Sequence, residues 1–143
     1  MAAYLLDANV ISSLIKRNED GKRVGGRLAD VLRQNATVLI SGVVYYEVAR
    51  GLHHLASTQS GAGSRQLAFL MTLAGNLKWC DLDMDTWEEG ARLWAKCRSH
   101  GTPTGAGLDK DVLIAAQARR NNAVIVTNNA RHMRLLEVSH ENW

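Results

Sequence analysis

Three acidic side chains stand at positions in the sequence where a carboxylate could do chemistry. Asp7 directly follows the apolar run Tyr4–Leu6, Glu47 interrupts the apolar segment Val43–Ala49, and Asp111 lies near the start of a helix-like stretch. Carboxylates that converge on one crevice repel each other, and a divalent cation relieves that repulsion. Because all the donors are oxygens, Mg²⁺ or Mn²⁺ suits them better than zinc. Such an ion could activate water for attack on a phosphodiester.

Each of these acids also has a purely structural interpretation. Asp7 could cap the helix that follows its strand, and Asp109 could cap the helix that it precedes. Asp111 would interact favourably with the dipole of that same helix. A buried Glu47 needs a partner, and Arg50, one helical turn later, could supply it through an ion pair. The interpretation as a metal site therefore depends on the three acids meeting, and not on any one of them.

The elements that must position these acids alternate along the chain. Continuous apolar runs predict strands buried on both faces. The predicted strands are Ala3–Leu6, Ala36–Ile40, Leu77–Leu82 and Ala123–Val126. Helical spacing of apolar residues predicts helices at Val10–Lys16, Lys22–Arg33, Val43–Leu55, Gln66–Leu77 and Asp109–Arg120, with a further one capped by Asp85 or Thr86. This order predicts an α/β fold, a three-layer α/β/α arrangement around a mostly parallel sheet of four or five strands, whose carboxyl ends gather the ligands.

The segments between these elements carry their own signals. Residues 57–64 are rich in glycine and serine and predict a loop, while residues 100–107 hold the only proline and predict a mobile or sharply turned connection. On the helix after Asp85, the residues Trp87, Ala91 and Trp94 share one face, which we expect to pack in the core.

The composition is that of one globular domain covering residues 1–143. Cys80 and Cys97 are expected to be buried reduced thiols, because no CxxC pattern is present. No secretory signal is visible, and no apolar run reaches the about 20 residues that cross a bilayer. We therefore expect a cytoplasmic protein without a membrane contact. The formal net charge of +3 permits a polyanionic partner without demanding one.

Three motifs together resemble the PIN-domain ribonucleases, in particular the toxins of bacterial VapBC toxin–antitoxin pairs. The motifs are Tyr4-Leu5-Leu6-Asp7-Ala8-Asn9-Val10-Ile11, Val43-Val44-Tyr45-Tyr46-Glu47-Val48-Ala49-Arg50-Gly51, and Asp111-Val112-Leu113-Ile114-Ala115-Ala116-Gln117-Ala118 followed by Ala123-Val124-Ile125-Val126-Thr127-Asn128-Asn129. They occur in the family's order and span nearly the whole chain. The resemblance implies Mg²⁺, or Mn²⁺ in its place, held mainly by Asp7 and Asp111, with Glu47 as a nearby acid. It also implies a structured RNA substrate such as a transfer or ribosomal RNA, a homodimer, and a VapB-like antitoxin that inhibits the toxin.

The sequence departs from the family pattern near its last predicted strand. A fourth position that is acidic in many members aligns with Asn129, and a further acidic position holds His132. Asp109 could compensate because it lies near Asp111. In the mechanism that we expect, Asn129 and Thr127 hydrogen-bond a ligand water or the substrate. Glu47 orients or deprotonates the attacking water.

RNA bound at an acidic crevice needs cations around it. The candidates are Lys16, Arg17, Arg50 and Arg131, although each one is as readily explained as an ordinary surface charge. Phosphate contacts of this kind would give a salt-dependent affinity without a choice of sequence.

Two other functions remain open from the sequence. A non-catalytic PIN-like binding module would keep the scaffold but act by occupying a partner or an RNA, which the uncharged Asn129 allows. A phosphoryl-transfer protein would use Asp7 as its nucleophile, although Asn9 replaces the second acid of a DxD arrangement. A metal titration tests the first alternative, and trapping of a phospho-aspartate tests the second.

Overall fold

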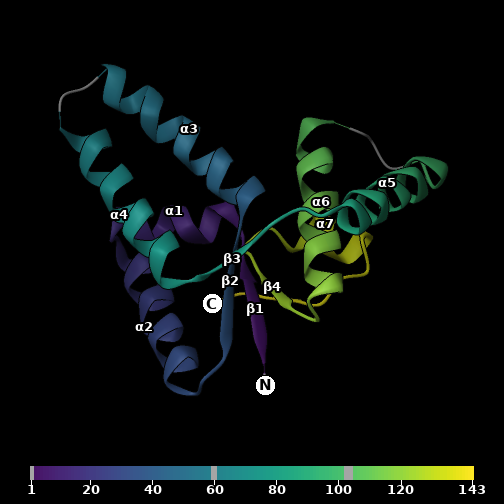
Figure 1. Ribbon diagram of the computed structural model, residues 1–143, viewed down its shortest axis with the longest axis horizontal. Helices are drawn as coiled ribbons and strands as arrows, with labels where there is room; N and C mark the ends of the chain where they lie inside the picture. Colours follow the sequence, from purple (N-terminus) through teal and green to yellow (C-terminus); the bar gives the residue numbers. More distant parts are fainter. Residues whose placement is uncertain (1, 59–60, 102–104) are drawn as a thin grey trace.

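A five-stranded parallel sheet forms the middle layer of the computed structural model, which describes residues 2–58, 61–101 and 105–143 (Figure 1). The strands are β1 (Ala3–Leu6), β2 (Thr37–Ser41), β3 (Lys78–Cys80), β4 (Val124–Val126) and β5 (His140–Glu141). Their order in the sheet is β3-β2-β1-β4-β5, and every neighbouring pair is parallel. The sheet therefore has the parallel character that the sequence predicts, with the larger of the two expected strand counts.

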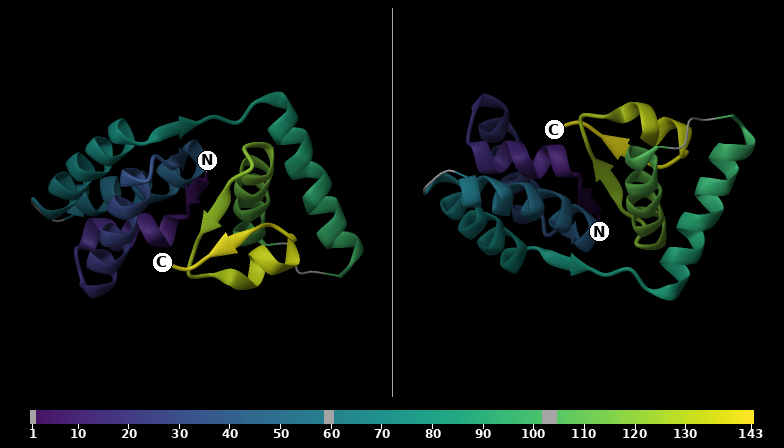
Figure 2. Two further views of the ribbon diagram at one scale, coloured as in Figure 1. Left: turned by 90° about the horizontal axis from the view of Figure 1, so that it is seen from below. Right: turned by 90° about the horizontal axis from the view of Figure 1, so that it is seen from above.

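Seven helices of the described residues cover the two faces of this sheet. They are α1 (Ala8–Lys16), α2 (Glu19–Arg33), α3 (Gly42–Thr58), α4 (Ala62–Asn76), α5 (Met84–Ser99), α6 (Ala106–Arg120) and α7 (Ala130–Leu135). Helices α1 to α4 lie on one side and α5 to α7 on the other, with α5 outermost beyond α6 (Figure 2). The predicted three-layer α/β/α fold is thus confirmed.

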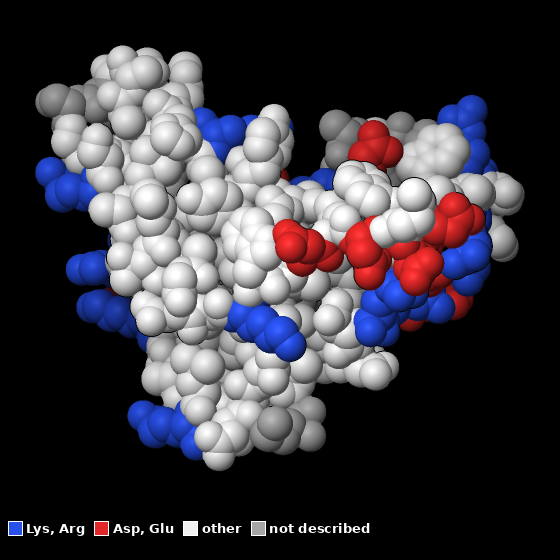
Figure 3. All heavy atoms as spheres, viewed as in Figure 1, with Lys and Arg blue, Asp and Glu red and all other residues white. Residues whose placement is uncertain are grey.

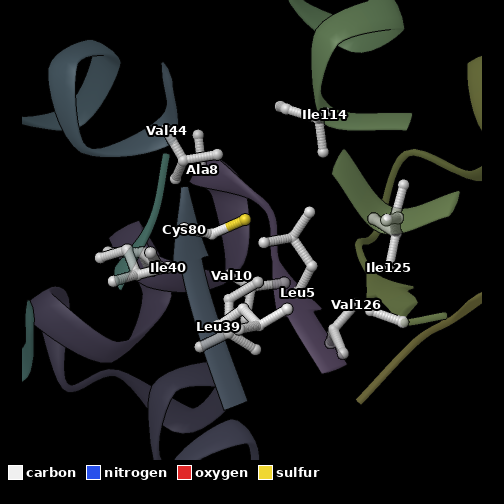
Figure 4. Packing of buried hydrophobic residues seen from close by; sticks show 14 of the residues in the cluster. Leu5, Ala8, Val10, Leu39, Ile40, Val44, Cys80, Ile114, Ile125 and Val126 are labelled. Carbon is white, nitrogen blue, oxygen red and sulfur yellow. The ribbon is translucent and has the colours of Figure 1, made fainter. Parts of the chain in front are cut away.

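The core forms where the central strand β1 meets its two neighbours. Leu5 pairs in register with Leu39 of β2 and Ile125 of β4, and all three side chains are buried. Ile11 of α1 and Ile114 of α6 are fully buried too and join the same hydrophobic cluster, in which Ile114 is labelled in Figure 4. Full burial of one such side chain contributes about 1.5–3 kcal/mol. This apolar packing fixes the ends of β1 and β4, where the polar residues begin.

The chain reverses its direction across the sheet at β1. It runs from β1 through β2 to β3 on one side, and then crosses to β4 and β5 on the other side. Parallel sheets bind ligands beyond the carboxyl ends of strands at such a reversal. Asp7 follows β1 and Thr127 follows β4, so both residues lie at this point.

The loop predicted for residues 57–64 is wrong over most of its length. Helix α3 continues to Thr58, and α4 already begins at Ala62. The hydroxyls of Ser57 and Thr58 donate to the carbonyl oxygen of His54, at 2.7 Å and 3.3 Å, so both side chains bond back onto their own helix. Residues 59–60 lie outside the described part of the chain, as do residues 102–104 of the second predicted connection.

Helix α5 differs from its prediction in its cap and in its buried face. Its N-cap is Asp83, which accepts a hydrogen bond from the backbone N–H of Thr86 at 2.8 Å, and neither Asp85 nor Thr86 has that role. The predicted core face is only partly right: Trp94 packs against the core, but Trp87 is 51% exposed, and the buried side chains are Leu93 and Cys97. Gly90 is buried on the same face as Leu93 and Cys97 and lies close to α6, so it sets how near the two helices come. The close approach at Gly90 leaves no room for a side chain as large as tryptophan at this position.

The C-terminal residues complete the sheet rather than trailing from it. After α7, strand β5 pairs with β4, and the indole of Trp143 meets the ring of Tyr4 edge to face, with centroids 5.2 Å apart. Both cysteines are free and buried, as predicted. Within the described ranges, no helix combines the length and the apolar character that a bilayer crossing requires.

Candidate active site

Asp7 is held at the carboxyl end of β1 by hydrogen bonds from its backbone and its side chain. Its N–H donates to the carbonyl oxygen of Val126 at 2.9 Å, which fixes it to the neighbouring strand. Its Oδ1 accepts from the N–H of Ala8 at 2.8 Å, and its Oδ2 accepts from the hydroxyl of Thr127 at 2.8 Å. The predicted helix cap is therefore present. A carboxylate offers about four acceptor positions, so Asp7 can cap α1 and still bind a cation.

Thr127 connects Asp7 to the segment that follows β4. The buried Oγ1 of Thr127 accepts from Asn9 Nδ2 at 3.4 Å and from the backbone N–H of Asn129 at 3.0 Å. Asn129 is the N-cap residue of α7, but its side chain is exposed and makes no capping hydrogen bond. The described contacts of Asn129 thus involve its backbone, and the predicted bond from its side chain to a ligand water stays a prediction.

Asp111 is buried on α6, and its Oδ2 is in close contact with Nδ1 of His132 on α7. Burial raises the pKa of the Asp111 carboxyl above its ordinary value, and the negative charge of Asp7 adds to the rise. The hydrogen bond with His132 and the charge of Lys110 lower this pKa and only partly offset the burial. Asp111 is therefore costly to keep ionised without a further cation nearby.

Glu47 pairs with Lys110, and not with Arg50 as the sequence predicted. Lys110 Nζ lies 3.0 Å from Glu47 Oε1, and both side chains are between a quarter and a third exposed. The guanidinium of Arg50 instead lies over the ring of Tyr46, 5.3 Å from its centroid. The prediction was wrong because it considered only residues on the same helix, whereas the partner, Lys110, lies on α6. The second oxygen of Glu47, Oε2, is buried and has no hydrogen-bond partner among the described residues.

The ammonium of Lys110 faces all three predicted acids. Besides its bond to Glu47, Lys110 Nζ lies 4.0 Å from Asp111 Oδ1. Burial lowers the pKa of the Lys110 ammonium, but the hydrogen bond to Glu47 and the charges of Asp7, Glu47 and Asp111 outweigh it and raise the pKa above its ordinary value. The fold thus brings the three acids into one neighbourhood, centred on a lysine.

The donor chemistry of this neighbourhood fits one hard cation. Among the described residues, no three His, Cys, Asp or Glu side chains form a ready-made metal cage. Mg²⁺ does not need one, since it keeps several waters and is usually bound by one or two carboxylates together with substrate phosphates. Asp7 and Asp111 can supply those carboxylates, and the unpartnered Oε2 of Glu47 can accept from a ligand water.

Asp109 was expected to cap α6 or to support Asp111. The helix begins at Ala106, so its N-cap is Gly105, and Asp109 lies in the first turn with an exposed side chain. Residues two apart on a helix do not face each other, which explains why Asp109 is exposed while Asp111 is buried. The expected cap is therefore wrong.

Two hollows meet at the Glu47–Lys110 pair. The first measures about 410 Å³ and lies between α1, α3 and α4, and Lys16 is among its lining residues. The second measures about 280 Å³ and includes Arg50. Lys and Arg side chains are visible in the hollow between the α3–α4 arm and the α5–α6 arm (Figure 3). Two of the four predicted RNA contacts thus border the acidic site.

The other two predicted RNA contacts lie elsewhere. The guanidinium of Arg17 lies over the ring of Phe69, 5.1 Å from its centroid, beside a separate hollow. Arg131 is exposed on α7. Lys110 was not predicted as a site residue, because a lysine between two aspartates at the start of a helix has the pattern of a surface charge. Only the approach of α3 to α6 reveals its role.

Comparison with known proteins agrees with this architecture. The family model described as PIN domain matches residues 4–137. Among solved structures, the chain is similar to a chain of VapBC2 from Rickettsia felis bound to a DNA fragment from their promoter, with 26% identity and a TM-score of 0.79 over 99% of this chain and 98% of that one. It is also similar to a chain of DNA-bound VapBC from Salmonella typhimurium, with 26% identity and a TM-score of 0.78 over 100% and 99%. No curated protein sequence matches the chain.

Proposed function

Because the chain belongs to the PIN-domain family, we propose that it is a Mg²⁺-dependent endoribonuclease and the toxin of a VapBC-type toxin–antitoxin pair. The observation that carries this proposal is the pair of buried carboxylates, Asp7 and Asp111, at the point where the parallel sheet reverses. Two buried acids in one neighbourhood, with Glu47 beside them, have the donor chemistry of a magnesium nuclease. The similarity to chains of VapBC complexes supports the assignment to a toxin.

In the proposed mechanism, Asp7 and Asp111 hold the ion. When bound, Mg²⁺ lowers the pKa of water and neutralises charge on the phosphodiester. Thr127 and the N–H of Ala8 keep the Asp7 carboxylate in place. Glu47 accepts the proton of the attacking water at Oε2, the oxygen that has no donor of its own. The water oxygen then bonds to phosphorus as the bond to the leaving ribose oxygen breaks, and that oxygen takes up a proton from solvent water.

The proposed substrate is a structured RNA such as a transfer or ribosomal RNA. Lys16 and Arg50 border the two hollows beside Glu47, where they can contact phosphates on either side of the cleaved bond. Asn129 contributes a hydrogen bond to a ligand water or to the substrate, and Arg17 and Arg131 extend the basic surface. Affinity from such contacts falls as salt concentration rises.

The proposed partners are a VapB-like antitoxin and a second copy of the chain. Large apolar side chains are exposed, which favours protein–protein contacts. The most exposed of them are Tyr46, Met71, Met84 and Trp87. The antitoxin would inhibit by covering the acidic site, as the resemblance to VapBC toxins implies.

Cleavage of an RNA mixture with and without EDTA tests the proposed activity. We expect the wild type to cleave with Mg²⁺ and EDTA to abolish cleavage. Asp111→Asn should lower the rate by more than the 10–100-fold that loss of an outer-shell partner of a metal site costs. Asp85→Asn, an equal change of charge at an exposed position on α5, serves as the control and should cleave normally. Wild-type cleavage by Asp111→Asn would contradict the assignment.

A non-catalytic binding module is the second candidate, and one observation favours it. Lys110 already neutralises part of the acidic charge without a metal. Such a module would bind RNA with salt-dependent affinity but leave it intact at every Mg²⁺ and Mn²⁺ concentration. The same cleavage assay therefore separates the two candidates.

A further inference from the structure

The free oxygen of Asp111 is the one that faces Lys110. His132 contacts Asp111 Oδ2, so a metal that binds this carboxylate has Oδ1 left to use. Lys110 Nζ lies 4.0 Å from that Oδ1 and 3.0 Å from Glu47 Oε1. The ammonium therefore occupies the side of the carboxylate that a metal ion needs.

Of the described lysines and arginines that border the two hollows, only Lys110 pairs with these acids, and His132 on the other oxygen of Asp111 adds positive charge only when it is protonated. Arg50 lies over Tyr46, and Lys16 is exposed on the rim of the first hollow. The charges that face Lys110 are Glu47 from α3, Asp111 from its own helix and Asp7 from the start of α1. Lys110 is thus the resident counter-ion of the site.

A divalent ion and the Lys110 ammonium repel each other when both approach Oδ1 of Asp111. Like charges a few ångströms apart repel strongly in a partly buried crevice. Lys110 has a flexible four-carbon stem and is 27% exposed at the junction of the two hollows, so its ammonium can move outward when an ion enters. If the ammonium moved outward, Oε1 of Glu47 would lose its ion pair as well.

We propose that Lys110, anchored by its ion pair with Glu47, competes with the divalent cation for the carboxylate of Asp111, and thereby sets the metal affinity of the site. The proposal rests on the proposed function, since it assumes that a metal binds there. In the metal-free protein the lysine holds the acids together. In the loaded protein the lysine gives up its contact with Asp111 to the ion.

Mn²⁺ binding to purified protein tests the competition, with dissociation constants measured by calorimetry. Lys110→Met keeps the length of the side chain and removes its charge, and Lys22→Met makes the same change at an exposed position on α2, where the lysine pairs with Glu19. We expect Lys110→Met to bind Mn²⁺ about tenfold more tightly than wild type, because a nearby positive charge is removed and solvent screens part of its effect. Lys22→Met should bind with the wild-type constant.

Thermal unfolding of the metal-free proteins provides the second readout. Lys110→Met should have a lower Tm than wild type, because Glu47 then lacks its partner. Added Mn²⁺ should raise that Tm by more than it raises the wild-type Tm. A lysine with a purely structural role would leave the metal affinity unchanged or weaken it when removed.

The Mn²⁺ dissociation constants of the wild type and the two variants either support or contradict the competition. An unchanged Mn²⁺ constant in Lys110→Met, or an equal gain in Lys22→Met, would overturn the competition while leaving the proposed nuclease intact. If wild type and both variants fail to bind Mn²⁺, the proposed metal-dependent function fails, and the competition fails with it.

Discussion

At the scale of single residues, the site concentrates negative charge where water is scarce. Asp111 is almost completely buried and lies near a second buried acid, Asp7. Burial raises the pKa of Asp111 above its ordinary value of 3.8, so the folded protein binds a proton there more tightly than the unfolded chain does. Between the ordinary and the raised pKa, stability therefore falls as pH rises.

We expect Asp111→Asn to stabilise the metal-free protein at neutral pH. The amide keeps the shape of the carboxylate but carries no charge, so the cost of burying an ionised acid disappears. The gain in Tm over wild type should shrink as pH falls toward 3.8, where Asp111 becomes protonated in the wild type as well. Calorimetric scans in EDTA across this pH range measure it. A variant that is less stable than wild type at neutral pH would show that Asp111 is not under electrostatic strain.

The sequence was sufficient to find the acids but not their partners. Asp7 could be predicted because a buried strand ends at it, and Glu47 because it interrupts an apolar segment. The partner of Glu47 could not be predicted, because Lys110 is 63 positions away and only packing brings it near. The helical spacing had instead indicated Arg50, which is near Glu47 in sequence but lies over an aromatic ring.

At the scale of elements, close helix contacts fix the positions of the site residues. Helix α2 turns back on α1 at Gly21, where an added Cβ would lie 2.1 Å from the carbonyl oxygen of Ser13. The obstacle is backbone, which cannot swing aside as a flexible side chain can. Gly21 thus allows the tight corner that follows the helix capped by Asp7.

Gly21→Ala should destabilise the protein by about 1–3 kcal/mol, because the two helices must move apart. The matched control is Gly26→Ala on the same helix, where no atom of the described residues lies within 4 Å of the added Cβ. That change should stabilise by about 0.5–1 kcal/mol through helix propensity. Urea denaturation of both variants measures the difference, and equal effects of the two changes would show that the corner is not tight.

Element types were easier to predict than element ends. Apolar periodicity located the helices, but Ser57 and Thr58 were assigned to a loop although their hydroxyls bond back to their own helix. On α5, aromatic residues were assigned to the core although Trp87 is half exposed. Which face of a helix is buried depends on its neighbour, and a single sequence does not reveal that neighbour.

At the scale of the whole molecule, topology makes the site. Asp7, Glu47 and Asp111 are distant in the chain, and the parallel sheet with its reversal at β1 brings them together. The alternation of strands and helices predicted the three layers, and it predicted that the site lies at the carboxyl ends of the strands. This alternation did not predict that β5 pairs with β4, because β5 is only two residues long and shows no apolar pattern.

The most direct test of the account is anomalous diffraction from crystals of the wild-type protein soaked in Mn²⁺. We predict one manganese peak within bonding distance of an oxygen of Asp7 and an oxygen of Asp111, with the Lys110 ammonium turned away from both. A peak that touches neither carboxylate, or no peak at saturating Mn²⁺ with Lys110 still paired to Glu47, would contradict it.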